Sequence, residues 1–82
     1  MEKAEELKKL TRDTLGDGPG AGFYAKVDRM LEDGDWSNTS LVSATREIEK
    51  MVKLFVGIDS AGLLEKRYSE YFKSHKFKIE QS

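Results

Sequence analysis

Four segments of this chain repeat apolar residues at intervals of three and four, and short runs rich in glycine or other turn-forming residues separate them. Those intervals match the 3.6-residue turn of an α-helix, so each segment predicts a helix with one apolar face. The expected helices span about residues 2–15, 21–33, 40–56 and 60–75. Short amphipathic helices bury their apolar faces against one another. We therefore expect an all-α fold, a compact bundle of four short helices.

The third segment is the most apolar, and we expect it to be the central hydrophobic helix of the bundle. Its expected core face comprises Leu41, Ala44, Ile48, Met51, Val52, Phe55 and Val56. Gly57 then ends this helix, since glycine is common just past a helix terminus. Because so few residues separate the third helix from the fourth, we expect their axes to cross at a steep angle.

A chain of 82 residues supplies one small hydrophobic core, so residues 1–75 are expected to form a single helical domain. Residues 76–82 alternate apolar and polar side chains, which predicts a short strand-like or disordered C-terminal tail. No apolar run reaches the ~20 residues of a membrane span. The charged N-terminal segment lacks the pattern of a signal peptide, so a cytoplasmic location is expected.

The run from Gly16 to Gly22 holds four of the seven glycines and the only proline of the chain. Gly16, Gly18 and Ala21 have the spacing of a dinucleotide-binding loop, but that loop follows a strand and here a helix is expected. A Walker-type phosphate loop continues with lysine and then serine or threonine, whereas Gly22 precedes two aromatic residues. We therefore predict a structural joint, with binding of a small anion as the alternative.

No set of side chains has the pattern of a catalytic centre. Cysteine is absent, the serines lack a nucleophile-elbow context, and the single histidine, His75, lies beside lysines at the end of the fourth helix. We expect His75 to lie at the edge of the core or in solvent. The spacing of Asp33 and Asp35 is similar to the start of a calcium loop, but the later glycine and glutamate of that loop are missing. The sequence therefore predicts no enzyme activity, no cofactor and no metal site.

Several apolar side chains fall outside the expected core faces or in segments with no expected place inside, and a bundle this small has little interior to hold them. They are Trp36, Val42, Leu54, Leu63, Phe77 and Ile79. Exposed apolar groups that cluster usually mark an interface. The sequence therefore predicts a non-catalytic protein–protein interaction or regulatory module. Its partner is another protein or a second copy of the chain.

The alternative function is DNA binding. Residues 51–64 resemble a helix-turn-helix motif, with Gly57 at the turn and with Lys66 and Arg67 facing the DNA. Lys53 departs from the motif, because the first helix usually carries a small residue there, and Lys66 stands where the second helix is usually apolar. The formal net charge is −1, so no overall field attracts nucleic acid. Nucleic acid is therefore the less favoured partner.

Overall fold

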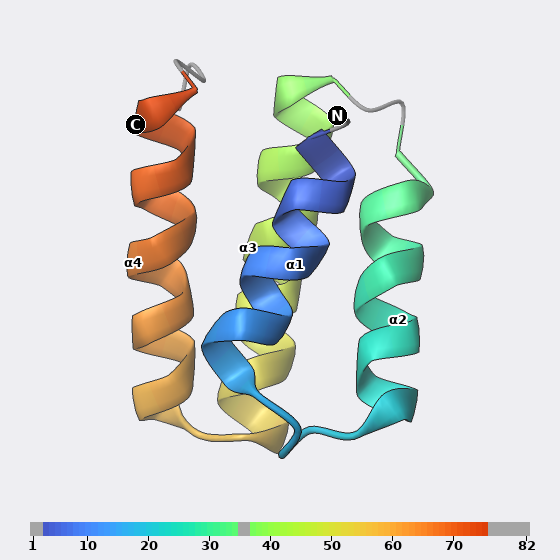
Figure 1. Ribbon diagram of the computed structural model, residues 1–82, viewed down its shortest axis with the longest axis vertical. Coiled ribbons are helices and arrows are strands. Elements are labelled where there is room, and N and C mark those ends of the chain that lie inside the picture. Colours follow the sequence, from blue (N-terminus) through green and yellow to red (C-terminus); the bar gives the residue numbers. More distant parts are fainter. Residues whose placement is uncertain (1–2, 35–36, 76–82) are drawn as a thin grey trace.

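The computed structural model describes residues 3–34 and 37–75 of the chain. Its helices are α1 (Lys3–Leu15), α2 (Ala21–Glu32), α3 (Asn38–Phe55) and α4 (Ile58–Ser74), and no strand occurs among the described residues. Successive helices run in opposite directions and pack side by side (Figure 1). The predicted all-α bundle of four helices is confirmed, and each described helix end lies within two residues of its expected position.

Each helix packs against two neighbours, so the four close a ring around the core. α1 and α3 each contact both α2 and α4. Figure 1 shows α1 in front of α3, with α2 and α4 at the two sides. α3 and α4 lie antiparallel along their lengths, and the expected steep crossing is therefore wrong. Gly57 explains the difference, because its φ of +147° lets the chain reverse directly between the two helices.

All four helices contribute to one hydrophobic core, and α3 is the longest of them. The core consists of Ala4, Leu7, Val27, Leu31, Leu41, Ile48, Val52, Ala61, Leu64, Tyr68 and Phe72. The sequence placed Leu41, Ile48 and Val52 correctly, but its placement of Phe55 and Val56 in the core is wrong, because both are exposed. α3 continues past its last core residue, Val52, and ends where the facing helix α4 is only beginning.

The glycine run joins α1 to α2 at the same end of the bundle as the turn between α3 and α4 (Figure 1). Gly16 has a φ of +68°, and its N–H donates to the carbonyl of Arg12 at 2.8 Å, which caps the end of α1. Gly20, with a φ of +88°, immediately precedes α2. These two backbone conformations favour glycine on structural grounds alone.

A buried hydrogen bond connects the first and last helices through the core. The hydroxyl oxygens of Thr11 and Tyr68 lie 2.5 Å apart, and the Thr11 hydroxyl is also 2.7 Å from the carbonyl of Leu7. Because that carbonyl can only accept, the Thr11 proton points to it, and the Tyr68 hydroxyl donates to Thr11. The pair satisfies two polar groups inside an otherwise apolar cluster.

Candidate functional site

Large apolar side chains are exposed at the end of the bundle where α3 passes into α4. Leu54, Phe55 and Ile58 expose 78%, 74% and 70% of their surface, and Val56 exposes 40%. We call these four residues the apolar tip. Single exposed apolar residues are common on proteins, but here four within a five-residue stretch gather at one end of the bundle. The tip is therefore the first candidate for a contact surface.

The tip only partly coincides with the apolar residues that the sequence predicted for a partner surface. Leu54 belongs to the tip, and Leu63 is 45% exposed on α4. Val42 is half-buried and packs against the core, so its expected place outside the core is wrong. Its position on α3 turns it toward α4, where it lines a small hollow together with Phe72. Outside the described residues lie Trp36, Phe77 and Ile79.

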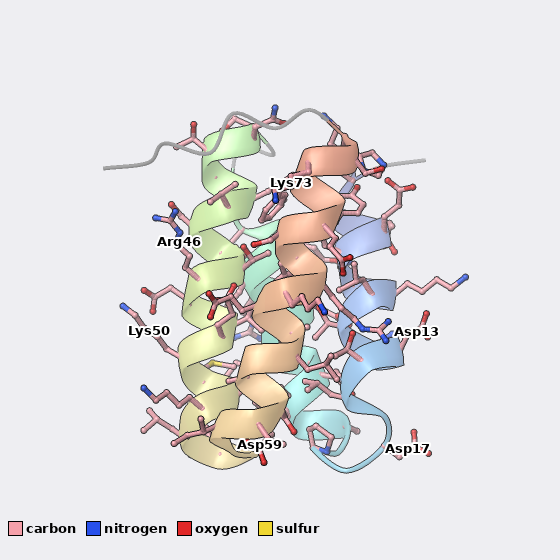
Figure 2. The ribbon with its side chains drawn as sticks, turned by 90° about the vertical axis from the view of Figure 1, so that its left-hand side faces the viewer. Asp13, Asp17, Arg46, Lys50, Asp59 and Lys73 are labelled. Carbon is pink, nitrogen blue, oxygen red and sulfur yellow. The ribbon has the colours of Figure 1, made fainter. Side chains whose placement is uncertain are left out.

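A groove between α3 and α4 continues from the tip along the bundle. Its volume is about 450 Å³. Its lining consists of Arg46, Glu49, Lys50 and Lys53 from α3 and of Ile58, Ala61, Gly62 and Glu65 from α4. Figure 2 shows Arg46 and Lys50 projecting from α3 at the side of the molecule. Because Ile58 belongs to both features, the tip and the groove form one connected surface.

Glu49 is a half-buried carboxylic acid in this groove. Burial raises the pKa of Glu49 to about 7, the nearby Glu65 carboxylate adds to the rise, and Arg46 opposes it. The carboxyl group is therefore partly protonated near neutral pH. Its charge, and hence the charge of the groove, changes within the physiological range.

We expect Glu49→Gln to stabilise the protein near pH 8 by roughly 1 kcal/mol, a figure reduced for the exposure of the carboxyl to water. The pKa is raised in the folded state, so the wild type has its full stability below about pH 4.5 and loses part of it as the pH rises through about 7. Urea unfolding near pH 4 and near pH 8 measures the difference, with the exposed Glu47→Gln as the control. An equal effect of Glu49→Gln at both pH values would contradict the expectation.

A second hollow, of about 540 Å³, lies between α1 and α2 beside the glycine run. Within it Arg12 pairs with Asp28 at 2.7 Å, its guanidinium lies 5.3 Å from the centre of the Tyr24 ring, and the Tyr24 hydroxyl donates to the carbonyl of Gly16. Asp17 and Asp28 place two carboxylates against one guanidinium, a balance that disfavours a phosphate. These contacts support the structural role of the joint, and anion binding there stays an untested alternative.

The residues predicted for DNA contact are exposed on α4, but they do not belong to a helix-turn-helix. In that motif two helices meet at about 90–120°, whereas α3 and α4 are antiparallel. Lys66 and Arg67 point about 100° apart because they are consecutive in a helix, and Arg67 lines a hollow beside α1 that also contains Glu6 and Asp13. The geometry expected for DNA binding is therefore missing, and DNA binding itself stays a prediction.

His75 lies at the end of α4 in a contact that fastens that end to α1. Its ring stacks on the Tyr71 ring with 4.0 Å between centroids, and its Nε2 lies 3.8 Å from the Glu6 carboxylate. The Tyr71 hydroxyl donates to the same carboxylate at 2.7 Å. Burial, together with this hydrogen bond, raises the pKa of Tyr71, so the hydroxyl remains a donor at ordinary pH. His75 is exposed, one of the two positions that the sequence allowed.

Comparison with known proteins finds no relative: no protein family, no curated protein and no solved structure matches the chain. None of the described helices combines the length and apolarity needed to cross a membrane. Across residues 3–34 and 37–75, no group of three or more His, Cys, Asp or Glu side chains is placed to hold a metal ion. The absence of enzyme activity and the cytoplasmic location stay expectations from the sequence. The candidate site rests on the geometry of the tip and the groove.

Proposed function

We propose that this protein is a non-catalytic interaction or regulatory module and that the apolar tip is its contact surface for another protein chain. The observation that supports the proposal is the exposure of Leu54, Phe55 and Ile58, each by at least 70%, at one end of a bundle whose core is complete without them. Burying an apolar side chain of this size gains about 1.5–3 kcal/mol. Covering three of them offsets part of the free-energy cost of association.

The composition of the tip suits a protein partner. Phe55 offers a large aromatic ring, the kind of side chain that often anchors an interface. Lys53 precedes the tip and Asp59 follows it, so charged groups flank the apolar residues as in the polar rim of many interfaces. Among the described residues, neither the buried core nor the half-buried side chains packed against it include a tip residue. The exposed surface of the tip is therefore not needed to hold the described fold.

Site-specific photo-crosslinking tests this function. A photoreactive phenylalanine analogue replaces Phe55, and irradiation in cells of the organism that encodes the chain should give discrete protein adducts. Adding Leu54→Asp and Ile58→Asp should reduce their yield by about tenfold, because both charges oppose desolvation of the patch. The matched control carries the analogue at Arg29, which is exposed on α2. Equal adducts at both positions, or a yield that the aspartates leave unchanged, would argue against the tip as the contact surface.

A further inference from the structure

We propose that the tip binds a second copy of this chain, placed so that α3 of each copy lies over α4 of the other. This inference rests on the proposed function, since it takes the tip as an interface and names its partner. The tip, the groove that leads from it and the charges on the two sides of that groove carry the argument. The tip and the groove supply the contact area, and the charges select the placement.

The shape of the groove allows close approach. Gly62 lies in the first half of α4 on the groove, and a Cβ built there meets no described atom within 4 Å apart from its own stretch of helix. Its φ is not positive, so neither the backbone nor the packing of the chain requires glycine. Glycine within a helix costs about 1 kcal/mol relative to alanine. A second backbone that approaches α4 at this point accounts for a residue that the isolated bundle does not need.

The charges on the two sides of the groove are opposite. α3 contributes Arg46, Lys50 and Lys53 to the groove, with Glu49 half-buried among them. The α4 side carries Glu65. Asp59 lies in the first turn of α4 and directly follows the tip residue Ile58. Figure 2 shows Asp59 at the lower end of the molecule. Lys66, the neighbour of Glu65, is not part of the groove lining. The α3 side of the groove is therefore net basic even with Glu49 ionised, although Lys50 also pairs with Glu47 at 3.5 Å. The α4 side carries one acid in the groove, Glu65, and a second, Asp59, beside the tip.

These charges select one of two symmetric arrangements of two copies. A two-fold axis that crosses the helices at right angles places α3 on α3, which sets basic side chains against one another. A two-fold axis parallel to the helices places α3 on α4 of the partner copy, which sets basic side chains against acidic ones. The parallel axis also brings both tips to the same end, where Leu54 and Ile58 of the two copies cover each other. A stable interface buries about 800 Å² per partner, and the groove extends the contact beyond the four tip residues.

Sedimentation equilibrium of the full chain over a range of concentrations tests the proposal. The wild type should reach twice the chain mass of 9.3 kDa at high micromolar concentration. Ile58→Asp should weaken the dimer by about a hundredfold, and Lys53→Glu and Asp59→Lys by about tenfold each, since each charge reversal creates two like-charge contacts. An equimolar mixture of the Lys53→Glu and Asp59→Lys chains should dimerise again, because both contacts then pair opposite charges. Arg29→Glu on α2 is the matched control and should leave the mass unchanged.

Circular dichroism first establishes that each variant keeps the helical content of the wild type. A wild type that stays monomeric at every concentration would overturn the proposal that the partner is a second copy. Crosslinks from position 55 to a different protein would still support the proposed function. A dimer that Ile58→Asp leaves intact would place the interface elsewhere. A dimer that Ile58→Asp disrupts, but that the mixed charge variants fail to restore, would overturn the arrangement of α3 over α4.

Discussion

Leu64→Ala should lower the free energy of unfolding by about 3 kcal/mol, the largest loss that we expect from a single substitution here. Leu64 is 0% exposed on α4, a helix that contacts both α1 and α3, so the substitution leaves a cavity between three helices. A bundle of this length has a total stability of roughly 4–12 kcal/mol. The substitution therefore removes a large share of that stability and lowers the urea midpoint markedly.

The adjacent leucine is a matched control for this substitution. Leu63 lies on the same helix and is 45% exposed. Leu63→Ala deletes the same atoms but opens no enclosed cavity, and it should cost less than about 1 kcal/mol. Urea unfolding followed by circular dichroism measures both variants. Similar losses at the two positions would mean that the packing around Leu64 is not as described.

Thr11→Val should cost about 2 kcal/mol, and more than Tyr68→Phe, because only Thr11→Val leaves a buried polar group without a partner. Tyr68 is 1% exposed, and burial raises the pKa of its hydroxyl, which therefore stays protonated and needs an acceptor. Valine cannot accept, so Thr11→Val leaves a buried donor unpaired. Tyr68→Phe leaves the Thr11 hydroxyl bonded to the Leu7 carbonyl and should cost about 1 kcal/mol or less.

The double variant completes a cycle that isolates the hydrogen bond. With both substitutions no unpaired hydroxyl remains in the core, so the double variant should lose less stability than the sum of the two single losses. Urea unfolding of the four proteins under one set of conditions gives the coupling free energy. Additive losses would show that the Thr11 and Tyr68 hydroxyls do not interact in solution.

Helical periodicity was enough to predict the four helices, because each has one face that packs inward along most of its length. It could not predict where the core ends along the bundle axis. Phe55 and Val56 follow Val52 in the apolar sequence pattern, yet Val52 is buried and both of the others are exposed. Whether a residue near the end of α3 is buried depends on how far along the bundle axis the chain turns into α4. Phe55 and Val56 lie at that turn, where no described helix covers them. Two of the four tip residues were therefore assigned to the core, and Ile58 to the connection between helices.

Charged residues show a second limit of sequence patterns, because their burial depends on a neighbouring helix. The side chain of Lys8 is buried on α1 and pairs with Glu5 at 2.9 Å and with Glu32 of α2 at 2.5 Å. Glu49 is half-buried only because α4 lies alongside α3. Both residues look like ordinary solvent-facing charges in the sequence. The direction in which the chain leaves Gly57 was predicted wrongly for a similar reason, because the residues around Gly57 fit a hairpin as well as the expected steep corner.

The start of α1 and the end of α4 are held together, which determines where the protein can be attached to a scaffold without covering the apolar tip. The Tyr71 hydrogen bond to Glu6 holds the beginning of α1 and the end of α4 at the end of the bundle opposite the apolar tip (Figure 1). A tether attached at either place leaves the tip facing solution. Several copies on one scaffold would present their tips together at high local concentration, so that contacts too weak to persist singly would hold through avidity.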